Sequence, residues 1–194
     1  MKNKTGKLYI LSGPSGTGKG TIVKHLIPKL PQLVRSISAT TRLPRKGEVD
    51  GVHYFFISKQ SFLQKVSESE FLEYDLHFEN YYGTPKHFVE ENLAKGKNVL
   101  LEIDVEGALK VKKNYPQSVL IFVMPPNIAE LRRRLRARNT ESDADIEERL
   151  ARVEKEINLI EVYDYTVLND DINLAVEKVY KIIKENEYDH KTGH

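Results

Sequence analysis

The sequence has 194 residues, of which 40% are hydrophobic and 30% are charged, with a formal net charge of +2 at pH 7. This length and composition predict one globular domain with room for small inserted subdomains, and they exclude an intrinsically disordered chain. The net charge gives no argument for nucleic acid as a partner, and the absence of cysteine excludes disulfides, thiolate metal sites and a cysteine nucleophile.

The N-terminal segment is basic and is followed by the short apolar run Leu8–Leu11. This run is too short for a signal-peptide core or a membrane span. We therefore expect a cytoplasmic protein with no membrane partner, and the lack of cysteine suits a reducing compartment.

Leu8–Leu11 predicts a short buried strand, which runs into a glycine-rich turn and then a helix over about Lys19–Ile27. Later apolar runs predict strands at 99–103, 119–123 and 165–168, and helical patterns at 105–113 and 128–137 separate them. Alternating strands and helices indicate an α/β fold with a parallel sheet covered on both faces.

Two stretches interrupt this alternation. Residues 34–84 are rich in Tyr, Phe, Ser and Thr, and short strands such as His53–Ile57 predict a small mixed insert. Residues 127–152 are very polar and predict two helices joined by a turn near Asn139. We expect a core made of 1–33, 85–126 and 153–187, an insert at 34–84, a lid at 127–152, and a frayed tail at 188–194.

The turn Gly13–Lys19 fits the pattern GxxxxGK between a predicted strand and a predicted helix. In that context the backbone N–H groups and the helix N-terminus hold phosphates, and Lys19 neutralises β- and γ-phosphate oxygens. The alternative is a glycine-rich turn with a surface lysine. The predicted ATP-binding residues of this segment are Gly13, Pro14, Ser15, Gly16, Thr17, Gly18, Lys19, Gly20 and Thr21.

Gly20 departs from the usual phosphate loop, which has Ser or Thr as a Mg²⁺ ligand at this position. Thr21 follows, but on a helix it points about 100° away from position 20. Either Thr21 reaches the metal, or Mg²⁺ is held mainly by phosphates and water. The sequence Gly-Lys-Gly-Thr is a variant associated with nucleoside-monophosphate kinases.

A second anion site is indicated by a hydroxyl-rich loop that holds Arg42 and Arg45 and is followed by Tyr54 and Tyr82. Arginine forks bind phosphate oxygens bidentately, and tyrosine hydroxyls complete such a cage. The alternative is a solvated basic loop with core tyrosines.

The pattern Ser-x-Ser-x-Thr-Thr-Arg-x-x-Arg-x-Gly-Glu from Ser36 to Glu48, with Gly51-x-x-Tyr54, Phe71-Leu72-Glu73 and Asn80–Gly83, resembles the acceptor region of guanylate kinases. With the phosphate loop and Asn169-Asp170, the resemblance covers about four-fifths of the chain. It implies a P-loop NTPase core with a five-stranded parallel sheet, a mixed α/β GMP-binding insert and a helical lid. The GMP-binding residues that it implies, or that lie nearby, are Ser38, Arg42, Arg45, Tyr54, Glu73, Tyr82, Gly83, Thr84, Glu102 and Asp104.

The chemistry of Glu73 agrees with this resemblance. Guanine offers two adjacent donors, N1–H and the 2-amino group, so one carboxylate can accept from both, whereas adenine has an acceptor at N1. An exposed acid in the cluster 68–75 is the alternative for Glu73. For Asp104, at the end of a buried strand, a helix-cap role is the alternative to a place near the metal or the acceptor.

Residues 132–138 include five arginines, and Arg149 follows on the next predicted helix. Arginines from a closing segment can offset charge on a transferring phosphoryl group. Similarity to guanylate kinase lids favours Arg138 and Arg149, then Arg134, as catalytic residues with Lys19. Arg132, Arg133 and Arg136 are alternatively solvated pairs with Glu130 and its neighbours. Six acids beside six arginines in 127–150 argue against an RNA-binding patch.

The sequence thus predicts a guanylate kinase that moves the γ-phosphoryl group of ATP to GMP with Mg²⁺, in purine nucleotide metabolism. Expected partners are ATP, GMP and also dGMP, without nucleic acid, in a monomer or homodimer. Asn169 resembles the position that contacts the ATP adenine, and a turn-forming role is its alternative. The rival functions are a catalytically silent guanylate-kinase-like interaction module and a kinase for another nucleoside monophosphate.

Overall fold

The computed structural model describes residues 5–77, 79–137 and 143–192. Its larger sheet has five strands in the order β2-β7-β1-β8-β9. These strands are β1 (Leu8–Ser12), β2 (Leu33–Arg35), β7 (Asn98–Glu102), β8 (Val119–Met124) and β9 (Tyr165–Leu168). β2 pairs with β7, β1 with β8, and β8 with β9, all in parallel, so the predicted five-stranded parallel sheet is confirmed.

The chain divides into two compact units. Unit 1 comprises 5–8, 32–101 and 109–118, and unit 2 comprises 9–31, 102–108 and 119–192, each within the described ranges. The predicted GMP-binding insert falls in unit 1, while the glycine-rich loop and the predicted lid fall in unit 2.

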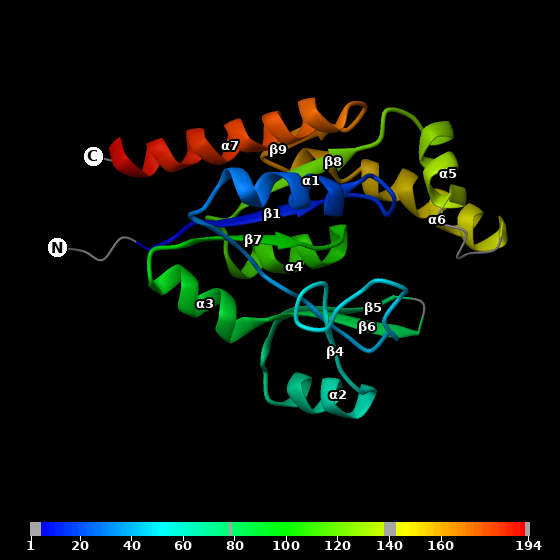
Figure 1. The fold of residues 1–194 in the computed structure, drawn as a ribbon, viewed down its shortest axis with the longest axis horizontal. Coiled ribbons are helices and arrows are strands. Elements are labelled where there is room, and N and C mark those ends of the chain that lie inside the picture. The colour runs from blue at the N-terminus through cyan, green and yellow to red at the C-terminus, as the bar shows by residue number, and fades with distance from the viewer. Residues whose placement is uncertain (1–4, 78, 138–142, 193–194) are drawn as a thin grey trace. The chain divides into compact units, whose positions relative to one another are not determined.

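Unit 2 is organised around the fully buried strand β1. Helix α1 (Lys19–Leu26) buries Ile22, Val23 and Leu26, and a 3-10 turn, η1 (Ile27–Lys29), ends it at the predicted proline. Helix α1 packs against α7 (Ile172–Thr192), which also contacts β9 (Figure 1). Helix α7 continues to Thr192, whereas the sequence predicted an ordered chain only to residue 187. A short turn, η2 (Ile160–Val162), precedes β9.

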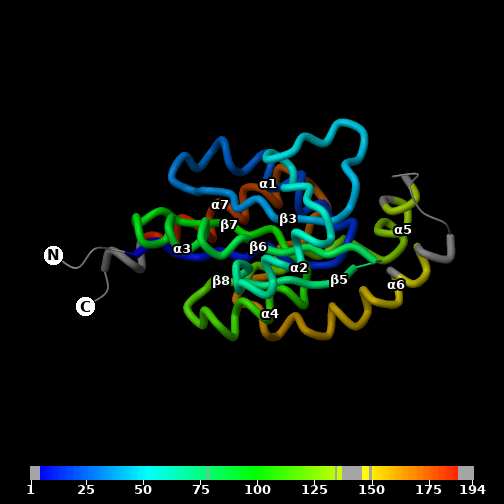
Figure 2. Tube along the Cα trace, turned by 90° about the horizontal axis from the view of Figure 1, so that it is seen from below, coloured from blue at the N-terminus to red at the C-terminus, as the bar shows by residue number. Residues whose placement is uncertain are grey.

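Helices α5 (Ile128–Ala137) and α6 (Asp143–Ile157) form the polar segment of unit 2 and pack side by side (Figure 2). Both helices are amphipathic, because apolar side chains recur every three or four residues. The shared apolar cluster consists of Leu131, Leu135, Ile146, Leu150 and Val153. The prediction of two helices here is confirmed.

Unit 1 contains a second sheet, with four strands in the order β4-β3-β6-β5. The strands are β3 (Ala39–Thr40), β4 (Phe55–Phe56), β5 (Phe71–His77) and β6 (Asn80–Pro85). β3 and β4 are parallel, while β6 is antiparallel to both β3 and β5, so the predicted mixed insert is confirmed. The strand expected over His53–Ile57 is only two residues long, because the chain on its N-terminal side turns at Gly51 with a φ of +72°.

Three more helices complete the fold. Helix α2 (Lys59–Ser67) begins at Ser58, whose hydroxyl accepts a hydrogen bond from the Ser61 N–H at 3.1 Å. Helix α3 (Lys86–Ala94) follows β6 directly, and α4 (Val105–Asn114) follows β7. Among the described residues, no helix has the length and apolar character needed to cross a membrane.

Candidate functional site

The loop between β1 and α1 adopts the backbone that the glycine pattern predicts. Gly13, Gly16 and Gly18 have φ angles of +135°, +88° and +89°, in the left-handed region that side chains other than glycine rarely adopt. A Cβ at Gly13 would lie 2.4 Å from the Val123 carbonyl oxygen. Glycine is therefore required here, both for the turn and for the close approach to β8.

Lys19 begins α1 and folds back over this loop. Its ammonium group donates to the carbonyl oxygens of Gly13 at 2.5 Å and Pro14 at 3.0 Å. The loop is further closed by the Thr17 hydroxyl, which donates to the Pro14 oxygen at 2.9 Å. The half-buried cation is thus held against the main-chain oxygens of the loop, and this arrangement excludes the alternative of a surface lysine.

Asn169, directly after β9, is 4% exposed and contacts the same loop. Its side-chain amide donates to the Thr17 carbonyl oxygen at 2.7 Å, and a Cβ at Gly18 would lie 2.5 Å from that amide nitrogen. Its own backbone N–H donates to the Met124 oxygen at 2.8 Å. The structure therefore gives Asn169 the role of joining the loop to the end of the sheet, which neither reading of the sequence anticipated.

The unusual Gly20 has a physical explanation in the structure. A Cβ at this position would lie 3.1 Å from Oε1 of Glu102, at the end of β7. A Ser or Thr side chain would therefore compete with the carboxylate for the same space. Thr21 is exposed on the first turn of α1. An acidic oxygen thus lies where other phosphate loops carry a hydroxyl.

Asp104 lies between β7 and α4 and caps the helix. Its Oδ1 accepts from the Gly107 N–H at 2.7 Å, and its carbonyl oxygen accepts from the Ala108 N–H at 3.0 Å. The helix-cap role that was the alternative for Asp104 is present in the structure.

Glu73 and Thr84 face each other across β5 and β6. The Thr84 hydroxyl donates to Glu73 Oε1 at 2.6 Å. Thr84 is 0% exposed and Glu73 is 8% exposed, so both residues are buried. A bulge between Phe71 and Glu73 shifts the register, so that Leu72 and Glu73 are both buried. The interpretation of Glu73 as an exposed surface acid is therefore wrong.

The predicted phosphate ligands of the insert also lie in unit 1. The guanidinium of Arg42 lies 5.5 Å from the centroid of the Tyr54 ring, and the Tyr54 and Tyr82 ring centroids are 6.0 Å apart. The Arg42 side chain is only 14% exposed, which excludes a solvated basic loop at that residue. Arg45 is exposed, and Ser38 is half-buried just before β3.

Gly83, on β6, is buried beneath two aromatic rings. A Cβ would lie 2.9 Å from Phe71 Cδ1 and 3.0 Å from Phe62 Cζ. Phe62 and Phe71 stack at 4.4 Å between centroids. The structure thus explains Gly83 by packing of the insert's core.

The arginines of the predicted lid divide into two sets. Arg133 pairs with Glu130 at 2.7 Å, as the alternative for these arginines predicted, whereas Arg132 pairs with Glu147 of α6 and not with Glu130 or its neighbours. The predicted catalytic side chains Arg134 and Arg149, and the whole of Arg138, lie outside what the structure describes.

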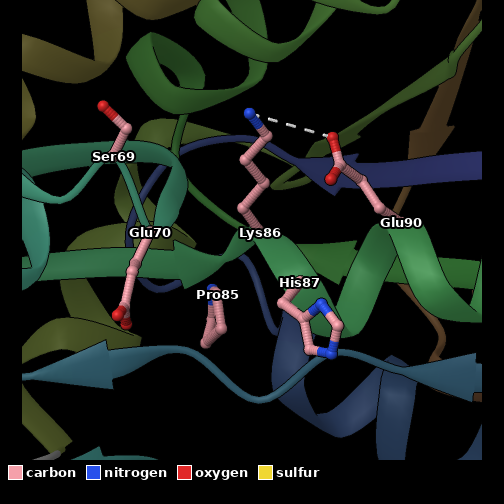
Figure 3. Close-up of a pocket in the computed structure, with 6 residues that line it drawn as sticks. All are labelled: Ser69, Glu70, Pro85, Lys86, His87 and Glu90. Carbon is pink, nitrogen blue, oxygen red and sulfur yellow. Dashed lines mark ion pairs between the residues drawn. The ribbon is translucent and has the colours of Figure 1, made fainter.

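A hollow lies on the surface of unit 1 around the start of α3 (Figure 3). Figure 3 shows the Lys86 ammonium directed at the Glu90 carboxylate, at 3.9 Å. The residues that line the hollow are Ser69, Glu70, Pro85, Lys86, His87 and Glu90. None of the predicted site residues lines this hollow, so it is not the predicted nucleotide site.

Glu48, the last residue of the acceptor motif, has a role in the structure that the sequence did not predict. Glu48 forms a bidentate ion pair with Arg42, with both N–O distances at 2.9 Å. The hint in the sequence was that an acidic residue, Glu48, ends a motif that contains Arg42 and Arg45. No sequence pattern indicates the pairing itself, because it depends on how the loop folds back.

The chain is similar to known proteins both in sequence and in structure. The sequence profile of the guanylate kinase family matches residues 5–186. A guanylate kinase of Caldanaerobacter subterraneus subsp. tengcongensis is 52% identical over 93% of this chain and 87% of that protein. A guanylate kinase of Oceanobacillus iheyensis is 49% identical over 95% of this chain and 89% of that protein. The crystal structure of a guanylate kinase from Anaplasma phagocytophilum has a TM-score of 0.79 and 35% identity, over 96% of this chain and 88% of that one.

Proposed function

The chain belongs to the guanylate kinase family and is an ATP:GMP phosphotransferase, and from this premise we propose which residues hold each substrate. The single observation that supports the acceptor assignment best is the buried pair of Glu73 and Thr84. A buried carboxylate is costly unless it is hydrogen-bonded, and one that lines a ligand site recognises donors.

We propose that Glu73 reads guanine. An ionised carboxylate has about four lone-pair positions, so it can accept from a hydroxyl such as that of Thr84 and also from N1–H and the 2-amino group of guanine. Adenine would place an acceptor against the carboxylate. Ser38 would contribute a hydroxyl at the same base. Arg42, Arg45, Tyr54 and Tyr82 would hold the GMP phosphate.

The ATP phosphates would lie in the Gly13–Lys19 loop. There Lys19 would exchange its bonds to the Gly13 and Pro14 carbonyl oxygens for phosphate oxygens, which carry more charge. Asn169 would act indirectly, by holding the Thr17 carbonyl and with it the loop. No covalent intermediate is needed, because an oxygen of the GMP phosphate attacks the γ-phosphorus directly.

We propose Mg²⁺ as the metal that accompanies ATP. When bound, it would neutralise negative charge on the ATP phosphates. The residues fit such an ion, because Mg²⁺ prefers oxygen ligands and retains water, and Thr21 and Glu102 offer oxygens beside Lys19 and Gly20. Glu102 is then assigned to the metal side of the site, and Asp104 to the helix cap beside it.

We propose a catalytic role for three lid arginines on the basis of the sequence alone. Arg134, Arg138 and Arg149 would stabilise charge on the transferring group together with Lys19, and the apolar cluster of α5 and α6 would support them. Because Arg132 and Arg133 are engaged with glutamates, they are less suited to that role.

We propose that the enzyme works in the cytoplasm, as a monomer or homodimer, and accepts dGMP as well as GMP. It would supply GDP and dGDP for GTP and dGTP. The catalytically silent alternative is disfavoured by the intact loop geometry and by Lys19 in place within it.

The test is a coupled assay of ADP release with ATP and each of GMP, AMP, CMP and UMP. We expect kcat/KM for GMP to exceed that for AMP by roughly 10⁴-fold, because a site built on hydrogen-bonding pairs rejects an analogue that leaves them unmade. Equal rates with all four acceptors would contradict the guanine assignment, and no turnover with any of them would contradict kinase activity.

A further inference from the structure

Glu48 lies in the loop between β3 and β4 and has no part in the assignments above. Its carboxylate is bound by one side chain and one main-chain group. Arg42 donates from Nη1 to Oε2 and from Nη2 to Oε1, both at 2.9 Å. The Arg45 N–H donates to Oε2 at 2.6 Å. The carboxylate thus joins the two arginines of the motif.

The pair is shielded from water. The side chains of Arg42 and Glu48 are 14% and 18% exposed, and the guanidinium also lies 5.8 Å from the centroid of the Phe56 ring. The hydrogen bond from Arg42 is the largest effect on the carboxyl group, and it holds the pKa of Glu48 below its ordinary value although burial opposes this. Glu48 is therefore an anion at neutral pH.

The geometry of the Arg42 guanidinium determines whether it can bind Glu48 and a second anion at the same time. An arginine has two edges that can each grip two oxygens, one formed by Nη1 and Nη2 and one formed by Nε and Nη2. Glu48 occupies the first edge, and the Leu43 carbonyl oxygen accepts the other Nη1 proton at 2.7 Å. The second edge is not engaged by Glu48.

Two of the proposed phosphate ligands lie near Arg42. Its guanidinium lies 5.5 Å from the centroid of the Tyr54 ring, and the Tyr54 and Tyr82 ring centroids are 6.0 Å apart. Tyr82 is one of the proposed phosphate ligands. A phosphate bound by the Arg42 guanidinium would therefore have tyrosines nearby.

We propose that Glu48 is a positioning residue that fixes the Arg42 guanidinium by one edge so that the other edge receives the GMP phosphate. It would act before the substrate arrives, by removing the rotational freedom of a long side chain. This inference rests on the proposed function, since it takes the GMP phosphate as the ligand of Arg42.

The opposite role is that Glu48 imitates the phosphate and must leave before GMP binds. The two roles differ in the sign of one measurement. A positioning carboxylate makes GMP bind more tightly, whereas a competing carboxylate makes it bind more weakly. Replacement by glutamine, which keeps the shape and removes the charge, separates them.

The experiment measures steady-state kinetics and calorimetric binding of GMP and of guanosine, which lacks the phosphate, to Glu48→Gln. We expect KM and Kd for GMP to rise by about 10-fold or more, kcat at saturating GMP to change less than about 3-fold, and guanosine binding to be unchanged. Glu91→Gln removes a carboxylate from an exposed pair with Lys95 and is the matched control. A fall or no change in Kd for GMP would overturn the inference.

A double-mutant cycle tests whether Glu48 acts through Arg42. In an Arg42→Ala background, Glu48→Gln should have no further effect on Kd for GMP, because the group it positions is gone. Additive losses would overturn the inference, since they would mean that Glu48 acts independently. Both measurements leave the proposed function separately testable. If wild-type protein turned over no GMP, the proposed function would fail, whereas normal wild-type turnover with an unaffected Glu48→Gln would defeat only this inference.

Discussion

The loop Gly13–Lys19 and the loop Arg42–Glu48 are both proposed to hold a phosphate group, and they are built differently. The first uses main-chain groups, and its shape depends on glycines with positive φ that approach neighbouring atoms closely. The second uses side chains, and its shape depends on a carboxylate that pairs with an arginine. One is a backbone cradle and the other is a side-chain clamp.

This difference matters for what each loop can recognise. A backbone cradle binds triphosphate oxygens without regard to the base, because the N–H groups are the same in every residue. A side-chain clamp can be combined with a base-reading residue, and here Tyr82 and Thr84 lie on the same strand as neighbours of the clamp and of Glu73. Discrimination is therefore expected to reside in unit 1, and the chemistry common to kinases in unit 2.

The largest effect should come from removing the one charged group of the cradle. Lys19→Met should lower kcat by roughly 10²–10³-fold or more, because a preorganised cation near the transferring charge is lost. Far-UV circular dichroism and the unfolding midpoint should be nearly unchanged, since Lys19 is only half-buried and donates to the carbonyl oxygens of a loop. Lys24→Met, an exposed lysine on the same helix, is the control. Normal kcat in Lys19→Met would contradict the cradle assignment.

The next largest effect should be a loss of discrimination between GMP and AMP when Glu73, in unit 1, is replaced. Glu73→Gln should reduce kcat/KM for GMP by about 10- to 100-fold, because a hydrogen bond to a charged acceptor contributes about 1.5–3 kcal/mol. The rate with AMP should fall much less, so the GMP to AMP ratio of kcat/KM is the quantity to measure. Glu70→Gln is the control, because this nearby carboxylate is exposed and pairs only at the surface with Lys65. A ratio that stays constant would remove Glu73 from base recognition.

Paired glycine substitutions compare the two loops directly. Gly18 and Gly47 have φ angles of +89° and +85°, but a Cβ would contact Asn169 at Gly18 and nothing within 4 Å at Gly47. Each alanine should cost about 1 kcal/mol for the left-handed backbone, and Gly18→Ala should cost about 1–2 kcal/mol more because the bond from Asn169 to Thr17 is disturbed. Urea unfolding of both variants measures the difference. Equal losses would mean that Asn169 does not hold the loop.

Much of the fold could be predicted because the signals were local. The apolar run 119–123 matches β8, and 165–168 matches β9 residue for residue. Strand β2 was missed as a strand because three residues carry no periodicity, and it exists through its pairing with β7. It also crosses the expected boundary between residues 33 and 34, so Arg35 belongs to the core sheet.

The candidate site was predicted as a set of residues but not as a set of contacts. The glycine pattern indicated the loop, but not that Asn169 would bind its Thr17 carbonyl. The motif contained Glu48, but not its pairing with Arg42. The burial of Glu73 depends on a bulge, which pattern reading does not detect. These contacts join residues distant in sequence or depend on a register shift, so local signals cannot give them.

The smallest effect concerns the last residue of β1, Ser12, which precedes the cradle and contacts Tyr163. The Tyr163 hydroxyl donates to Ser12 Oγ at 3.1 Å, and the ring packs edge-on against Phe122. Tyr163→Phe keeps the packing and loses the hydrogen bond, so the free energy of unfolding at pH 7 should fall by about 1 kcal/mol. Tyr74→Phe is the control, because Tyr74 lies at the surface and is 43% exposed.

The pH dependence makes this prediction specific. Burial raises the pKa of Tyr163 to about 12 from an ordinary value of 10.0. The folded protein therefore keeps the phenol proton at pH values where the unfolded chain loses it, so this contribution is fully present below pH 10 and is lost as pH rises toward 12. Over that window wild type should lose about 2 kcal/mol that Tyr163→Phe does not lose. Urea unfolding at pH 7, 9, 10.5 and 11.5 should show the two stabilities converge and then cross, and parallel curves would mean that the phenol ionises equally in both states.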